Sequence, residues 1–467
     1  MKISIQVKID NEQDQPIVEN IAQLDKGVTE EDLVGLSLSE SKTVLKKLQT
    51  IIIEQQAQQY TEENRCCSHC QQPRRIKGST TIQYKTLFGI VSLPNQRLYH
   101  CTCHSGKEKT LSLLSGWLPE HISPELQYVE TKWASLMSYG LSADLLKDVL
   151  PIHATLNAES IRRHLHKTAN RQDEALDETP EFVSGCAYEW GQLPKPGKPL
   201  TVGIDGGYVK NCSDKKNHFE VIVGKCFSKT KSGKRLGFVQ TLEKNPKKRL
   251  MSMLENQGMQ ANQQITFLSD GGDSVRELQY IMHPEAEHVL DWFHVTMRLT
   301  VLNQFAKGLV LSDPEDGARV TKDLASAKWY LWHGNVKKTM DKLDYCYCIL
   351  EDEDLHYANR IKFNKTVVEM ITYIDNNQHL IPNYGEKYRF GETITTAFVE
   401  STVNEVVAKR MVKKQQMQWS PQGAHYLLQA RTAVLNDELR SQFEAWYPGM
   451  KEGQNTLQAE EGFAMAA

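Results

Sequence analysis

The sequence lacks several features that would place it in a broad class at once. It has no run of about 18 consecutive apolar residues, so no membrane-spanning helix is predicted. Its first residues also lack the apolar segment of a signal peptide. We therefore expect a cytoplasmic protein with no membrane partner. An excess of basic charge is missing too, because the net charge is −3. Any contact with nucleic acid must then come from local basic patches.

Cysteines are few and unevenly distributed. Five of the ten lie between Cys66 and Cys103, and in a reducing compartment such clustering indicates a metal site rather than a disulfide framework. A Cys-x-x-Cys pair and a Cys-x-Cys pair, joined by strand-like sequence, place four thiolates at tetrahedral reach of a structural Zn²⁺ ion. The predicted ligands are Cys67, Cys70, Cys101 and Cys103, and the substitutes in another register are Cys66, His69, His100 and His104.

Two stretches combine an apolar strand, an aspartate and two glycines. A strand over 200–204 is predicted to end at Asp205, and a strand over 264–269 is predicted to end at Asp270. Asp-Gly turns after buried strands are common. The repetition, with a third carboxylate later in the chain, favours two ligands of a Mg²⁺ or Mn²⁺ site, because a divalent cation removes the repulsion between neighbouring carboxylates.

The elements around these aspartates follow a recognisable order. Three strands in a meander (200–205, 218–227 and 237–242) precede a helix (247–257), a strand, a helix (274–282) and a last strand (288–291). This is the order of an RNase H-like fold, an α/β core with a mixed five-stranded sheet. The first and fourth strands are neighbours in that fold, so Asp205 and Asp270 would lie side by side. An all-α insertion is expected over 292–394.

The third carboxylate is expected on a helix that resumes the core after residue 395. Glu400 borders the apolar stripe of this helix and is favoured over Glu405 as the remaining metal ligand. Three basic residues further along the helix are expected to bind phosphates: Lys409, Arg410 and Lys413.

A helix-turn-helix is predicted within 123–172. Pro124 opens a helix that Gly140 is expected to end, a short helix follows over 142–150, and Asn157 caps a helix over 158–171. The last helix is basic and is expected to enter the major groove of DNA. An ordinary three-helix unit with a solvated basic face is the alternative. The predicted DNA-binding residues on this helix are Arg162, Arg163, Lys167 and Arg171.

These patterns divide the chain into seven segments. They are an N-terminal region with an amphipathic helix (1–63), a zinc-binding β unit (64–122), the helix-turn-helix (123–172), a linker (173–198), the first part of the core (199–291), the helical insertion (292–394), and the last core helix with the C-terminal tail (395–467).

Several of these motifs together resemble a known family. Gly-Ile-Asp205-Gly-Gly, Leu-Ser-Asp270-Gly-Gly, Asp291-Trp-Phe-His294, Phe-Val-Glu400-Ser and Met417-Gln-Trp-Ser-Pro are similar to the motifs of DDE-class insertion-sequence transposases, in particular the ISKra-type group. The resemblance covers most of the chain. It implies a bacterial, nucleoid-associated DNA transposase with Mg²⁺ at the three acidic residues. The implied partners are double-stranded DNA, as terminal inverted repeats and target, and further copies of the chain in a homodimer or larger assembly.

The resemblance also gives expectations for the chemistry. Two divalent ions about 4 Å apart would activate a water or a DNA 3′-hydroxyl and stabilise the leaving 3′-oxygen. His294 is expected in the active-site architecture or in contact with a DNA strand, with a satisfied histidine near the core as the alternative. Trp292 and Trp332 are candidates for stacking on a flipped base, with a place in the helical core as the alternative.

Two other functions stay open from the sequence. One is a nuclease of the same fold that cuts DNA without joining strands. The other is a non-catalytic DNA-binding regulator built on the zinc unit and the helix-turn-helix.

Overall fold

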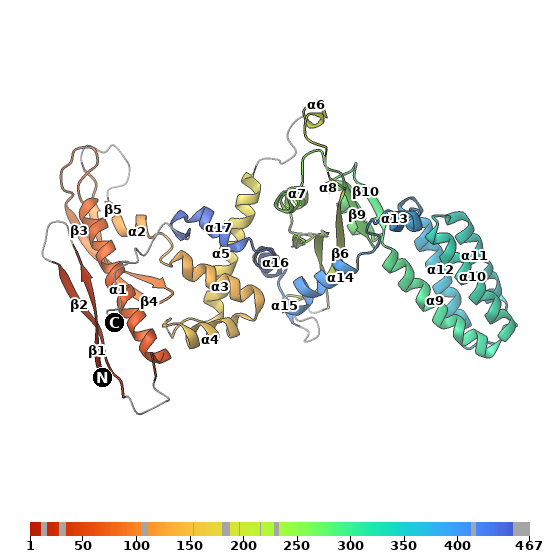
Figure 1. Cartoon of the computed structure of the whole chain (residues 1–467), viewed down its shortest axis with the longest axis horizontal. Coiled ribbons are helices and arrows are strands. Elements are labelled where there is room, and N and C mark those ends of the chain that lie inside the picture. The colour runs from red at the N-terminus through yellow and green to blue at the C-terminus, as the bar shows by residue number, and fades with distance from the viewer. Residues whose placement is uncertain are drawn as a thin grey trace, which may run out of the picture. The chain divides into compact units, whose positions relative to one another are not determined.

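The structure is a computed structural model, and it describes residues 1–10, 16–27, 34–101, 103, 110–152, 154–179, 187–195, 197–214, 216–227, 233–411 and 417–451. The chain divides into two compact units, one formed by Met1–Thr168 with Asp437–Ala467 and the other by Ala169–Asn436. Both units contain helices and strands (Figure 1), which confirms the α/β class.

The first unit contains two small antiparallel sheets. One pairs β1 (Lys2–Ile9) with β2 (Ile17–Asp25), and the other has the order β3 (Ile76–Thr86), β4 (Gly89–Tyr99), β5 (Thr110–Ser112). The helices of this unit are α1 (Leu38–Glu63), α2 (Leu113–Trp117), α3 (Pro124–Leu136), α4 (Tyr139–Val149), most of α5 (Ala158–Glu178), α17 (Leu439–Trp446) and η5 (Pro448–Met450).

Local sequence explains where α1 begins and which face it buries. The Ser37 hydroxyl accepts from the Glu40 N–H, and the Glu40 carboxylate accepts from the Ser37 N–H, so the two residues form a capping box. Ile53 and Ala57, one turn apart, pack into an apolar cluster with side chains of β3 and β4. The predicted amphipathic helix is therefore present and lies against the second sheet.

The helix boundary expected at Gly140 is wrong. The α3 helix ends at Leu136, and Ser138 caps a new helix by accepting from the Leu141 N–H. Gly140 is the second residue of α4. The Ser138 cap helps to offset the conformational entropy that glycine loses in a helix. The cap at Asn157 is confirmed, since its side chain accepts from the Ser160 N–H at 2.9 Å.

The second unit is built on a mixed sheet with the strand order β10-β9-β6-β7-β8. Strands β10, β9 and β6 run parallel, β7 and β8 are antiparallel to their neighbours, and the short β11 pairs with the end of β6. The strands are β6 (Leu200–Asn211), β7 (His218–Phe227), β8 (Arg235–Val239), β9 (Ile265–Ser269), β10 (Glu287–Leu290) and β11 (Gln418–Trp419).

Helices cover both faces of this sheet (Figure 1). The apolar residues of α7 (Pro246–Gln257) and α8 (Asp273–Met282) share a core with the side chains on one face. On the other face lies a helical run made of α14 (Ala397–Val403), the π-helical turn η3 (Asn404–Ala408) and α15 (Lys409–Met411), together with α16 (Pro421–Leu435). Helix α6 (Ala187–Gly191) precedes the sheet in sequence.

A helical region separates β10 from α14 in the sequence. It contains α9 (Trp292–Ser312), α10 (Pro314–Trp332), α11 (Val336–Glu351), α12 (Arg360–Asn376), η2 (Gln378–Leu380) and α13 (Tyr384–Arg389). Its long helices bury one apolar stripe each in a shared core, including Leu302, Leu324, Leu343 and Val367. None of the helices that the described residues form has the length and apolarity needed to cross a bilayer.

Candidate functional site

The strand β6 carries Asp205 in its interior, not at its end. The predicted end at Ile204 is wrong, because Gly206 and Gly207 continue the ladder with β7. Glycine suits positions 203 and 206 because neighbouring groups occupy the space that a side chain would fill. A Cβ on Gly206 would lie 2.7 Å from the Glu220 carboxylate, and a Cβ on Gly203 would lie 2.0 Å from the Val399 side chain. The strand stays paired while α14 lies directly on it.

Asp270 lies next to Asp205 because β9 runs parallel to β6. Gly203 is paired with Leu268, and two further residues along each strand lead to Asp205 and Asp270. Gly271 then turns the chain with a positive φ of 78°, which a side chain would disfavour. The Asp270 carboxylate accepts from the Gly272 N–H at 2.9 Å, which fixes its orientation.

Glu400 approaches the same place from α14. Val399 and Val403 of this helix contact the positions of Gly203 and Gly207, which flank Asp205 on one face of β6. The Glu400 charge acts on Asp205. The rival Glu405 forms an ion pair with Arg235 at 2.9 Å.

The electrostatics of Asp205 reflect this crowding. Burial, then the Asp270 charge, and more weakly the Glu400 charge raise the pKa of Asp205 to about 6, against a lowering effect of His294. A carboxyl that resists ionisation is a group whose charge would be stabilised by a bound cation. The ligand oxygens of the three carboxylates do not all lie within 4.8 Å of one another. Among the described residues, four cysteines in the first unit meet that limit.

The raised pKa predicts a measurable effect on stability. The folded pKa of Asp205 is about 6 and the reference value is 3.8, so the folded state binds this proton more tightly than the unfolded state. Its favourable contribution is present below pH ~4 and is lost as the pH rises through ~6. In the presence of a chelator, we expect Asp205→Asn to gain about 2 kcal/mol over the unsubstituted protein between pH 4 and pH 7. Urea unfolding of the second unit at both pH values measures this difference. Parallel pH dependences of the two proteins would contradict it.

Asp291 forms hydrogen bonds at both the start and the end of the helical region. Its buried carboxylate accepts from the Phe293 N–H at 2.9 Å, which starts α9, and from the Thr396 N–H at 2.8 Å, which precedes α14. Burial alone would raise the pKa of Asp291, but hydrogen bonds from His294 and Thr396 outweigh it and lower that pKa. One side chain therefore fixes the start of the helix that carries Glu400.

His294 is hydrogen-bonded to Asp291 and lies near the carboxylates. Its Nδ1 is 2.6 Å from the Asp291 carboxylate. The hydrogen bond with Asp291 raises the pKa of His294 despite burial, and the charges of Asp270 and Asp205 act in the same direction. The structure thus brings His294 to the carboxylates, with its Nδ1 held by Asp291. A contact with DNA stays a prediction.

The two tryptophans pack with one another. The rings of Trp292 and Trp332 are 5.1 Å apart in an edge-on arrangement, and Trp292 lies 4.7 Å from the Tyr384 ring. Both are partly buried against apolar clusters. This arrangement favours the core interpretation over base stacking.

The basic residues predicted to contact DNA from α5 are partly engaged. Arg162 and Lys167 each form an ion pair with a glutamate, at 2.8 and 3.0 Å. Arg163 is exposed and Arg171 is half-buried. Contact between this helix and DNA stays a prediction.

The basic residues near the C-terminal end of the α14–α15 run differ among themselves. Lys409 is exposed. Arg410, expected to bind phosphate, is instead 2% exposed and packs over the Trp419 ring at 5.2 Å. It faces the interior because it belongs to the same buried helical stripe as Val406 and Met411. Lys413 lies outside the described residues.

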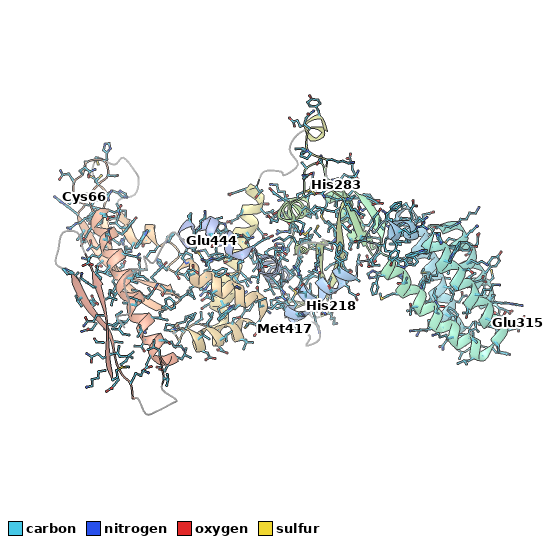
Figure 2. The ribbon with its side chains drawn as sticks, viewed as in Figure 1. Cys66, His218, His283, Glu315, Met417 and Glu444 are labelled. Carbon is cyan, nitrogen blue, oxygen red and sulfur yellow. The ribbon has the colours of Figure 1, made fainter. Side chains whose placement is uncertain are left out.

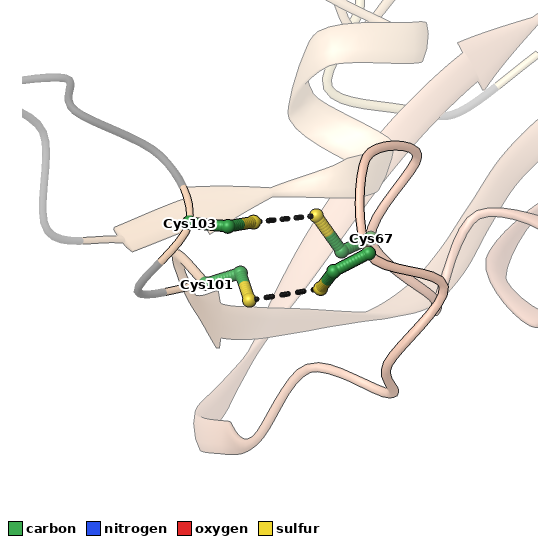
Figure 3. A group of neighbouring side chains, drawn as sticks. Cys67, Cys101 and Cys103 are labelled. Carbon is green, nitrogen blue, oxygen red and sulfur yellow. Dashed lines mark hydrogen bonds between the residues drawn. The ribbon is translucent and has the colours of Figure 1, made fainter.

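The four predicted cysteines converge, which confirms a cluster able to hold a zinc ion (Figure 3). Sγ of Cys67 is 3.6 Å from Sγ of Cys103, and Sγ of Cys70 is 3.1 Å from Sγ of Cys101. These distances exceed a disulfide bond of about 2.05 Å, and all four thiols are free. Backbone N–H groups of Cys70 and His69 lower the pKa of Cys67 to about 6. A thiolate is the form that binds metal.

A separate cavity lies further along β6. It has a volume of about 330 Å³ and is lined by Tyr208, Val407 and Met411, with His218 and Met417 (labelled in Figure 2). No acidic side chain lines it within the described residues. It is therefore distinct from the carboxylate cluster.

Sequence reasoning missed three residues that organise the carboxylate site. Thr396 directly precedes α14, Tyr373 lies on α12 and Arg298 lies on α9. Only Arg298 carries a usable sequence signal, since it lies one helical turn after His294. No protein-family model matches the sequence, and no curated protein matches it.

Proposed function

We propose that this protein is a DDE-class DNA transposase that cleaves and transfers DNA strands with Asp205, Asp270 and Glu400. The observation that carries the proposal is the approach of three carboxylates to one another at one side of a mixed sheet. Asp205 lies within β6, Asp270 directly follows the neighbouring parallel strand β9, and Glu400 lies on a helix packed on the same sheet; the charges of Asp270 and Glu400 raise the pKa of Asp205. Few structural roles require three acidic side chains to approach one another.

The fold that this proposal implies is RNase H-like. The strand order β10-β9-β6-β7-β8, with β6 central and parallel to β9, supports it. In this view α9 to α13 form an insertion between the last strand and the helix that bears Glu400.

The residues present suit Mg²⁺ or Mn²⁺. Asp205, Asp270 and Glu400 supply hard oxygen ligands, and a bound cation would stabilise the Asp205 charge that burial and the Asp270 charge disfavour. When bound, two such ions would activate the attacking hydroxyl and stabilise the leaving 3′-oxygen. The protein itself orients the Asp270 carboxylate through the Gly272 N–H and fixes α14 through Asp291.

The proposed substrate is double-stranded DNA that carries the terminal inverted repeats of the element. The proposed active form is a homodimer or larger assembly. The test uses the full chain with plasmid DNA that carries its coding region and flanking sequence, in Mg²⁺ or Mn²⁺. We expect strand breaks at the element ends and joined products, both abolished by a chelator.

Two outcomes would replace the proposal. Metal-dependent cleavage without joined products, and without preference for the element ends, would indicate a nuclease. Binding of DNA with no cleavage in either metal would indicate a regulator.

A further inference from the structure

Arg298 presents a cationic group beside the carboxylate site. It follows His294 by four residues on α9, so the two side chains share one face of the helix. Its guanidinium lies over the Tyr373 ring, with Cζ 4.1 Å from the ring centroid. The side chain is exposed. Such stacking holds the guanidinium plane in place while its N–H groups stay able to donate at the edge.

Tyr373 is itself fixed to the site. Its hydroxyl donates to the backbone carbonyl of Asp270 at 2.9 Å, which joins α12 to the end of β9. Burial raises the pKa of Tyr373, so the hydroxyl keeps the proton that it donates. Arg298 is therefore positioned, through the ring, next to the residue that carries one of the three carboxylates.

The charge of Arg298 is not neutralised by a direct contact. Within the part of the chain that the structure describes, no carboxylate lies within ion-pair distance of it, and its guanidinium lies against the Tyr373 side chain. Other arginines of the unit differ, because Arg276 pairs with Asp273 and Arg319 pairs with two acidic residues of α10. An exposed, oriented and unneutralised guanidinium is suited to an anion.

We propose that Arg298, stacked on Tyr373, binds a phosphate of the DNA strand whose neighbouring phosphodiester lies at the carboxylates. The inference rests on the proposed function, because it takes DNA as the ligand. Guanidinium groups bind phosphate oxygens through two parallel hydrogen bonds. The helical region thereby contributes a binding group to the site.

Binding of a fluorescent DNA duplex to the full chain, measured over a range of salt concentrations in a chelator, tests this inference without requiring cleavage. We expect Arg298→Gln to weaken binding about tenfold and to lower the slope of log affinity against log salt by about 1. Arg298→Lys should restore the slope, because it keeps the charge. Tyr373→Leu should weaken binding less than Arg298→Gln, because the charge remains but is no longer oriented.

The matched control is Arg319→Gln, which removes one exposed arginine from the same helical region. Gly317, two residues before Arg319, packs against Val310, and Val310 lies about 18 Å along α9 from Arg298, given 1.5 Å per residue. This variant should bind DNA like the unsubstituted protein. Equal affinities and slopes for Arg298→Gln and Arg319→Gln would overturn the inference, and so would a protein that does not bind DNA.

The two proposals can fail separately. If Arg298→Gln weakens binding but no metal-dependent cleavage occurs, the phosphate site stands and the transposase proposal fails. If the protein cleaves and joins DNA but Arg298→Gln binds and cleaves normally, the phosphate site is wrong and the transposase proposal stands.

Discussion

Replacement of Asp205 or Asp270 by asparagine, or of Glu400 by glutamine, should lower the rate of DNA strand cleavage by about a thousandfold or more. The reason is that each amide keeps the shape of the side chain and removes a negative charge that would hold the metal ions. Metal ions contribute several kcal/mol to stabilising such transition states, and each 1.36 kcal/mol is a factor of ten in rate. DNA affinity in a chelator should stay close to that of the unsubstituted protein. Strand cleavage of plasmid DNA and duplex binding are the two measurements.

Two control variants sharpen this test. Asp273→Asn changes an exposed aspartate three residues after Asp270, which pairs with Arg276, and it should cleave normally. Glu405→Gln changes the rival glutamate, which is held by Arg235, and it should keep most of its activity. An inactive Glu405→Gln beside an active Glu400→Gln would move the third carboxylate to Glu405. Full cleavage by all three amide variants would exclude the carboxylate site.

Removal of zinc should unfold the sheet formed by β3, β4 and β5. The purified protein is expected to contain about one zinc ion per chain, as four-cysteine sites do. Small metal-bound units lose their fold without the ion, because the site does not exist in the unfolded chain. Backbone amides of β3 and β4 should lose protection from hydrogen exchange in a strong chelator, whereas those of β6 and β7 should keep it. Substitution by Co²⁺ should give the absorption of a tetrahedral thiolate site.

Cys66 supplies the matched control for the zinc prediction. It is exposed, adjacent to Cys67 and outside the cluster. Cys67→Ser should lose zinc and the protection of β3, whereas Cys66→Ser should keep both. Loss of zinc from the Cys66 variant alone, or unchanged hydrogen exchange after zinc removal, would show that the cluster of four is not the metal site.

The cysteine cluster could be predicted from the sequence because its chemistry is local. Two short motifs joined by antiparallel strands leave few ways to arrange four thiols, and the predicted ligands are the four that converge. The order of strands and helices in the second unit was also predictable, because the hydrophobic pattern of the sequence changes between a period of two and a helical period.

The parts that could not be predicted depend on contacts between distant residues. The glycines after Asp205 predict the end of a strand, whereas they make room for Glu220 and for α14 while the strand continues. The charge of Arg410 predicts a phosphate-binding residue, although the side chain is buried over Trp419. The hydrogen bond between Asp291 and Thr396 spans 105 residues, and no local sequence pattern predicts it.

That bond between Asp291 and Thr396 also has a consequence for how the protein can vary. It closes the base of the helical region, so the chain leaves and rejoins the sheet at one fixed point. Adding or removing whole turns at the distal ends of α9 and α10 would change the length of the helical region by about 5.4 Å per turn. The geometry at the base of the helical region would stay the same, so the region can lengthen or shorten without moving the start of α14.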